Sequence, residues 1–200
     1  MDQVILYIHG QGGSPQEAER FRPLCPGYDV IGAGYQGSLP WQVRGQLLDA
    51  YGEARRQYRR VSVLANSIGC YFAMDAFRAC APARAYFISP VLDMEQLILD
   101  RMRWTGVSEA ELQAKGEIPT EWGDPLSWRY LCYVRERPLQ WDAPTEILYG
   151  DQDGLTDRQT VDAFVRSHPA RLTVMAGGEH WFHTAEQLAF LDGWLRNVLD

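Results

Sequence analysis

The chain has 200 residues, of which 46% are hydrophobic and 22% are charged. This length and composition favour one globular domain whose core is large enough to fold without disulfide or metal support. The net charge of −7 argues against nucleic acid or an anionic membrane as the main partner. The apolar run Val4–Ile8 follows no basic residues and is too short for a signal segment or a membrane span. We therefore expect a cytoplasmic protein.

The four cysteines, Cys25, Cys70, Cys80 and Cys132, are scattered through the chain. Their spacing matches no zinc-binding or redox pattern, so we expect reduced thiols and no metal site. Cys70 lies close to the serine motif described below, but nothing near it in the sequence supplies a base.

The predicted elements are typical of a parallel sheet with helices on its faces, because strand-like runs alternate with helical patterns. Several of the runs are apolar almost throughout, as in strands that are buried on both sides. The predicted strands cover 3–8, 28–33, 61–65, 84–89, 145–149 and 171–175. The predicted helices cover 15–24, 41–59, 68–80, 156–168 and 184–199.

One stretch interrupts this alternation. No convincing strand pattern occurs over 91–143, and an unstructured loop of that length is improbable in a compact domain. Ser108–Glu111 matches a capping box, and Asp124-Pro125 has the pattern of a further helix start. We expect a single α/β domain over 1–200 with a helical insertion over 91–143.

The most informative segment is VSVLANSIGC, residues 61–70. Its β-branched run ends in Ser67, which has small residues around it and an apolar helical pattern after it. In a nucleophile elbow the serine occupies a turn so tight that the residues two positions away on each side approach each other. Ala65 and Gly69 meet that steric requirement, so Ser67 is predicted to be a catalytic nucleophile.

Two later loops supply an acid and a base. In α/β enzymes with such an elbow, the triad follows the chain order Ser, then Asp or Glu, then His. The strand at 145–149 leads into Gly150–Asp153, and the strand at 171–175 leads into Gly177–His180. Both loops follow the carboxyl ends of strands, at the edge of the sheet where the elbow also lies.

Together with the loop after the first strand, these motifs resemble the α/β-hydrolase superfamily, and in particular small, cap-bearing serine hydrolases such as bacterial esterase-like proteins. The resemblance covers essentially the whole chain. In family order, the motifs are His9-Gly10-Gln11-Gly12-Gly13, Ala65-Asn66-Ser67-Ile68-Gly69, Gly150-Asp151-Gln152-Asp153 and Gly178-Glu179-His180. The elbow departs from the family in having Ala65 in place of the usual glycine, and the pattern lacks the family's leading antiparallel hairpin.

The resemblance implies an α/β-hydrolase fold with a six-stranded, mainly parallel sheet, helices on both faces and the insertion as a small helical cap. It assigns Ser67 as nucleophile, His180 as general base and Asp153 as the acid that orients the imidazole. The backbone N–H groups of Gln11 and Ile68 would form the oxyanion hole. The implied activity is cofactor-free hydrolysis of a small carboxylic ester or thioester through an acyl-enzyme, with a small-molecule acyl substrate as partner.

Alternatives remain for two of these positions. Asp151 is close to Asp153 in the same loop. Asp93 follows an earlier strand, a position that resembles the arrangement in relatives that carry the acid one strand earlier. His183 competes with His180 as the base, although His180 directly follows the glycine pair that leaves the strand.

The same fold also admits other functions. Amide or peptide hydrolysis uses the same triad, and a C–C hydrolase or lyase is a further option. A non-catalytic protein that binds a ligand or partner through the insertion belongs to a different class, and the complete Ser-Asp-His order argues against it. The insertion is rich in tryptophans that either pack it or line an apolar acyl pocket, namely Trp104, Trp122, Trp128 and Trp141.

A second glycine pattern, in residues 32–37, matches GxGxxG after a strand. In a dinucleotide site this motif runs directly into its helix. Here Ser38-Leu39-Pro40 intervenes, so we expect no nucleotide binding.

Overall fold

The structure is a computed structural model that describes residues 2–199. The chain forms two compact units. The first consists of the segments up to Leu92 and from Gln140 onward, and the second is Asp93–Leu139. None of the helices within 2–199 is both long enough and apolar enough to cross a membrane.

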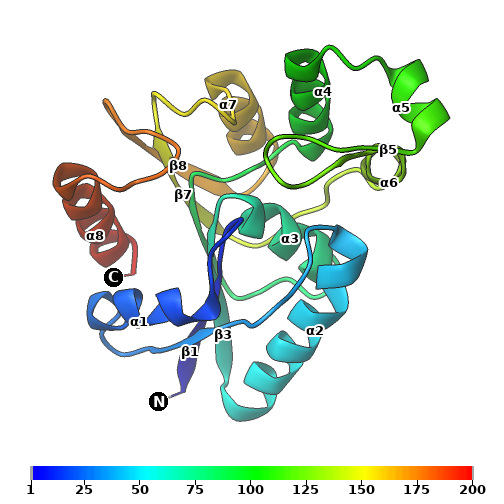
Figure 1. The fold of residues 1–200 in the computed structure, drawn as a ribbon. Coiled ribbons are helices and arrows are strands. Elements are labelled where there is room, and N and C mark those ends of the chain that lie inside the picture. The colour runs from blue at the N-terminus through cyan, green and yellow to red at the C-terminus, as the bar shows by residue number, and fades with distance from the viewer. Residues whose placement is uncertain (1, 200) are drawn as a thin grey trace. The chain divides into compact units, whose positions relative to one another are not determined.

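The first unit is built on a six-stranded sheet (Figure 1). Its strands are β1 (Gln3–Ile8), β2 (Asp29–Gly32), β3 (Arg60–Asn66), β4 (Ala85–Ile88), β7 (Thr145–Gly150) and β8 (Ala170–Met175). The strand order is β2-β1-β3-β4-β7-β8, and every neighbouring pair is parallel. The predicted α/β fold is confirmed, and each predicted strand agrees with the structure to within one residue at either end. All six carboxyl ends therefore lie at one edge.

Helices cover both faces of this sheet. Helices α1 (Ala18–Phe21) and α8 (Ala185–Leu199) lie on one face. Helices α2 (Pro40–Gln57), α3 (Ile68–Phe77) and α7 (Arg158–Ser167) lie on the other (Figure 1). This arrangement follows from right-handed crossovers between parallel strands. Strands β1, β4 and β7 are buried along almost their whole length, because both of their faces meet helices.

The segment predicted as one helix over 15–24 is instead three short pieces: η1 (Pro15–Glu17), α1 and η2 (Arg22–Leu24). Pro23 explains the break after α1, since proline has no N–H to donate and restricts the residue before it. A smaller difference concerns α7, which begins after Thr156. Asp157 caps it by accepting a hydrogen bond of 2.6 Å from the Thr160 N–H.

The second unit is mainly helical, as expected for the insertion. It contains α4 (Met94–Thr105), α5 (Glu109–Lys115), α6 (Trp128–Glu136) and a short antiparallel pair, β5 (Glu117–Ile118) and β6 (Leu126–Ser127). Ser108 caps α5 through its hydroxyl, which accepts a hydrogen bond from the Glu111 N–H at 3.2 Å. The capping box therefore marks a real helix start.

Two expectations for this unit are wrong. The Asp124-Pro125 pair does not begin a helix, because Ser127 caps α6 instead, with its hydroxyl accepting from the Tyr130 N–H. The stretch also contains strands, since Glu117 pairs with Ser127 and Ile118 pairs with Leu126. Two-residue strands are too short to produce a periodic pattern in the sequence.

Candidate active site

Ser67 occupies the turn between β3 and α3. Its backbone has φ 54° and ψ −124°, a region that residues other than glycine rarely adopt and that costs conformational energy. The Ser67 N–H donates to the Ile88 carbonyl at 2.9 Å, and the Ser67 carbonyl accepts from the Val91 N–H at 3.2 Å. These two bonds, one to the last residue of β4 and one to the segment that follows it, hold the strained residue in place.

Gly69 is required by a close approach between backbones. A Cβ atom at this position would lie 2.3 Å from the carbonyl oxygen of His9 and 2.8 Å from that of Ile8. Gly10, the next residue after His9, also contacts the elbow, since an added Cβ there would lie 3.2 Å from the Cβ of Ser67. The loop after β1 therefore packs directly against the serine turn.

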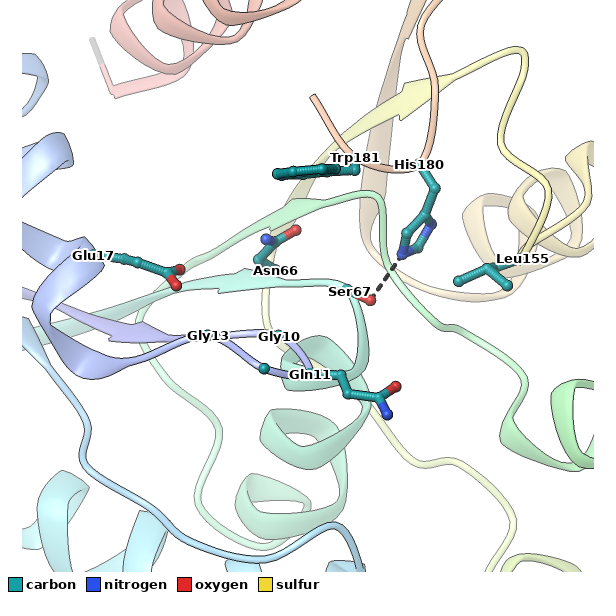
Figure 2. Close-up of a pocket in the computed structure, with 10 residues that line it drawn as sticks. Gly10, Gln11, Gly13, Glu17, Asn66, Ser67, Leu155, His180 and Trp181 are labelled. Atoms are coloured by element: carbon teal, nitrogen blue, oxygen red, sulfur yellow. Dashed lines mark hydrogen bonds between the residues drawn. The ribbon is translucent and has the colours of Figure 1, made fainter. Parts of the chain in front are cut away.

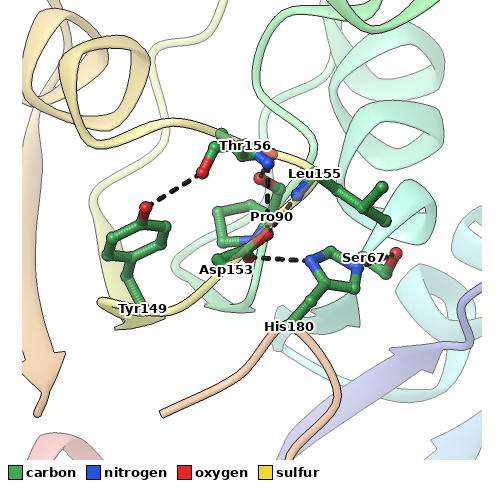
Figure 3. Close-up of polar contacts among 7 residues, drawn as sticks. All are labelled: Ser67, Pro90, Tyr149, Asp153, Leu155, Thr156 and His180. Carbon is green, nitrogen blue, oxygen red and sulfur yellow. Dashed lines mark hydrogen bonds and ion pairs between the residues drawn. The ribbon is translucent and has the colours of Figure 1, made fainter. Parts of the chain in front are cut away.

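The three residues predicted as a triad lie in one hydrogen-bonded chain (Figure 3). Ser67 Oγ is 2.8 Å from His180 Nε2, and His180 Nδ1 is 2.7 Å from Asp153 Oδ2. The Asp153 side chain is completely buried, whereas that of His180 is 18% exposed. A carboxylate can only accept, so the Nδ1 position carries the proton and Nε2 faces the serine hydroxyl as an acceptor.

The second oxygen of Asp153 is fixed by the backbone of its own loop. Oδ1 accepts from the Leu155 N–H at 2.8 Å and from the Thr156 N–H at 3.1 Å. Thr156 is held in turn, because its hydroxyl donates to the Pro90 carbonyl at 3.0 Å and its carbonyl accepts from the Tyr149 hydroxyl at 2.9 Å. Burial raises the pKa of Tyr149, which keeps that hydroxyl a donor.

The acid loop and the histidine loop are packed backbone to backbone. A Cβ atom on Gly150 would lie 2.2 Å from the carbonyl oxygen of Gly178. The Gln152 N–H donates to the same carbonyl at 2.8 Å, and Asp151 Oδ1 accepts from the Gly177 N–H at 2.7 Å. Asp151 therefore ties the two loops together.

The other candidates make different contacts. Asp93 lies at the start of the second unit and caps α4, where its Oδ1 accepts from the Gln96 N–H at 2.9 Å. The His183 ring has its Nδ1 2.7 Å from the Trp181 carbonyl and 3.4 Å from a carboxylate oxygen of Glu179. Cys70 is fully buried, and burial raises the pKa of its thiol well above the ordinary value.

The loop after β1 forms a tight turn beside Ser67. The Gly13 N–H donates to the Gly10 carbonyl at 3.2 Å, so Gln11 and Gly12 are the central residues of this turn. His9 stacks on the Tyr35 ring with centroids 4.1 Å apart, and the Tyr35 hydroxyl donates to the His9 carbonyl at 2.7 Å. The turn is therefore anchored at its base.

Ile68 is the first residue of α3. A backbone N–H in the first turn of a helix has no acceptor within the helix, and the helix dipole adds positive potential there. The arrangement suits stabilisation of an anionic oxygen next to Ser67 Oγ.

A cavity of about 490 Å³ opens over Ser67 and His180 (Figure 2). Its wall includes the turn after β1 and four residues for which the sequence suggested no role at the site: Glu17, Asn66, Leu155 and Trp181. Trp181 directly follows His180, and this adjacency to the predicted base could have indicated a place in the cavity wall. Glu17 follows Ser14 at capping-box spacing, a pattern that indicates helix capping rather than a place in a cavity wall.

The tryptophans predicted for the insertion are divided between the units. Trp141 belongs to the first unit, where it is buried and donates to the Thr145 hydroxyl at 2.7 Å. Trp104 and Trp122 are exposed in the second unit and pack edge to face, with centroids 6.0 Å apart. Over 2–199, no three His, Cys, Asp or Glu side chains gather in a way that could hold a metal ion.

No family model and no curated protein sequence matches this chain. Solved structures do resemble it. Est1E from Butyrivibrio proteoclasticus aligns with a TM-score of 0.78 and 16% identity, over 98% of this chain and 86% of Est1E. Alpha/beta hydrolase domain-containing protein 10 from mouse aligns with a TM-score of 0.77 and 14% identity, over 98% of this chain and 89% of the mouse chain.

XC6422 from Xanthomonas campestris, described as an α/β serine hydrolase without a lid, aligns with a TM-score of 0.65 and 16% identity, over 98% of this chain and 80% of its own. At identities this low, structural similarity shows a shared fold but does not show a shared activity. The chain has the fold that these serine hydrolases and esterases share.

Proposed function

We propose that this chain of α/β-hydrolase fold is a serine hydrolase that cleaves a small carboxylic ester or thioester through an acyl-enzyme. The observation that carries the proposal is the unbroken chain of hydrogen bonds from Ser67 Oγ through His180 to the buried Asp153 carboxylate. Ser67, at the end of these hydrogen bonds, lines a cavity large enough for a small substrate. In one of its solved structures the similar protein Est1E holds ferulic acid, a carboxylic acid.

In the first half-reaction, His180 Nε2 takes the hydroxyl proton as Ser67 Oγ bonds to the acyl carbon. Asp153 stabilises the imidazolium and keeps its tautomer. The carbonyl oxygen becomes an oxyanion, which the Ile68 and Gln11 N–H groups bind. Collapse of this intermediate breaks the bond to the leaving alcohol or thiol, which takes the proton from His180.

In the second half-reaction, water gives a proton to His180 and attacks the acyl carbon. The carboxylic acid leaves, and the proton on His180 returns to Ser67 Oγ. The oxyanion donors also matter, because loss of one such donor typically slows these reactions by about 10²–10³-fold.

A fluorophosphonate probe read by intact mass tests the proposal. We expect one adduct on the wild-type protein, none on Ser67→Ala and strongly reduced labelling of His180→Ala. Esters of p-nitrophenol with increasing acyl length would then measure which acyl groups the cavity accepts. A folded wild-type protein that forms no adduct and hydrolyses no ester or thioester would overturn the proposal in favour of a binding protein of this fold.

A further inference from the structure

Glu17 lies where two cavities of the first unit adjoin. The cavity over Ser67 and a second cavity of about 340 Å³ share three wall residues: Glu17, Asn66 and Trp181. The second cavity is otherwise mostly apolar, with Phe21 and Leu191 among its wall residues. Any group that extends from the serine into the second cavity therefore passes the Glu17 carboxylate.

The carboxylate of Glu17 is held in a fixed position. Oε1 accepts from the Ser14 N–H at 3.0 Å, and Oε2 accepts from the Tyr7 hydroxyl at 2.5 Å. Gly13 leaves room for it, since a Cβ there would lie 2.7 Å from Oε1. Burial and the neighbouring Glu17 charge raise the pKa of Tyr7, so the tyrosine remains a neutral donor. A carboxylate has about four acceptor positions, so two remain for a ligand.

Among the side chains of 2–199, no Lys, Arg or His forms an ion pair with Glu17. Arg20 also lines the second cavity but is paired with Asp192 at 2.6 Å. The His183 ring, on the same wall, is directed to a backbone carbonyl and to Glu179. The uncompensated charge at the junction is therefore negative.

Trp181 adds an aromatic surface at the same place. Its side chain belongs to both cavity walls, and the residue is 73% exposed. Its ring stacks on the His183 ring with centroids 5.1 Å apart, and its exposure leaves ring surface accessible to a ligand. An accessible ring and a carboxylate that line the same two cavities can each attract an organic cation, the ring through its quadrupole and the carboxylate through its charge.

We propose that Glu17 and Trp181 form a recognition site for a primary ammonium group, so that the preferred substrates are esters carrying an amine on an apolar arm. The inference rests on the proposed hydrolase function and names its substrate class. The ammonium donates to the free acceptor positions of Glu17, and the arm spans the first cavity, whose wall includes both Ser67 and Glu17. Hydrogen bonds to charged groups are among the stronger ones in proteins, so selection of about tenfold or more is expected.

The test compares p-nitrophenyl esters of ω-amino acids with those of uncharged alkanoic acids of equal length, such as aminohexanoate with heptanoate. For the wild type, kcat/KM should be at least about tenfold higher for the ammonium ester at the best chain length. Glu17→Gln should remove this preference. The amide oxygen can still accept from Ser14, and equal unfolding midpoints would show that the loop is intact. Trp181→Ala should reduce the preference in the same direction.

Two variants serve as matched controls. Glu19→Gln makes the same charge change two residues away, at an exposed carboxylate paired with Arg22, and should keep the preference. Tyr7→Phe removes a hydrogen bond to Glu17 but leaves its charge, so it should keep most of the preference even if the loop loosens. Equal ratios of the two kcat/KM values in wild type and Glu17→Gln would overturn the inference while leaving the hydrolase proposal standing.

A binding measurement separates the two proposals. Calorimetric titration of Ser67→Ala with hexylammonium, and with hexan-1-ol as the uncharged analogue, needs no turnover. Tighter binding of the cation that disappears in the Ser67→Ala, Glu17→Gln double variant supports the recognition site even if no ester is hydrolysed. Equal binding of the two ligands to Ser67→Ala counts against it.

Discussion

Substitution of Asp153 by asparagine tests the direction of the hydrogen bonds in the proposed triad. Oδ1 accepts from two backbone N–H groups, of Leu155 and Thr156, so the amide oxygen must take that position. The amide NH₂ then faces His180 Nδ1, which has to accept. The imidazole proton moves to Nε2, which lies 2.8 Å from Ser67 Oγ and so donates to the nucleophile where it should accept.

The expected loss is about 10⁴-fold in kcat, as for the same substitution in Ser-His-Asp proteases, which corresponds to about 5.5 kcal/mol of transition-state stabilisation. The assays are ester hydrolysis and the second-order rate of fluorophosphonate labelling, with circular dichroism to verify folding. Asp151→Asn is the matched control and should keep activity, because its amide oxygen can still accept from Gly177. An Asp153→Asn variant within about tenfold of wild type would refute this reasoning.

Three further predictions concern stability and reactivity. Gly69→Ala should destabilise the fold by about 3 kcal/mol, the upper range for overpacking, because its Cβ meets the His9 carbonyl; an unchanged urea midpoint would contradict this. Thr156→Val should cost about 1–3 kcal/mol by leaving the Pro90 carbonyl unpaired, seen as a lower Tm, and an unaltered Tm would show that this bond contributes nothing. Because burial raises its pKa, Cys70 should resist iodoacetamide at about pH 8 until urea unfolds the protein, so labelling of the native state would argue against the buried position.

The fold was predictable because its signals are local and repeated. Strands such as β1 and β4 are apolar over almost their whole length, and their spacing by helical patterns leaves few possible topologies. Short elements were not predictable in this way. The β5–β6 pair has two residues per strand, which is too short for an alternating pattern of apolar and polar residues in the sequence.

The candidate site divides along the same line. Ser67, Asp153 and His180 occupy loops that follow strands, so parallel topology alone brings them to one edge. The remainder depends on contacts between distant segments. The sequence predicts a small residue at position 69 because of crowding within the elbow. In the structure Gly69 is needed because the backbone of Ile8 and His9 approaches it. Glu17 reaches the cavity through hydrogen bonds to Ser14 and Tyr7, which only the folded chain brings together.

The backbone contact between Gly150 and Gly178 makes the acid loop and the histidine loop a single mechanical part. Because Gln152 and Asp151 also bond to the histidine loop, we expect a displacement of one loop to carry the other with it. Transfer of this site to another scaffold therefore requires the segments 150–156 and 176–180 to be moved as one cassette. Changing the length of either loop alone would separate a pair that the fold keeps in register.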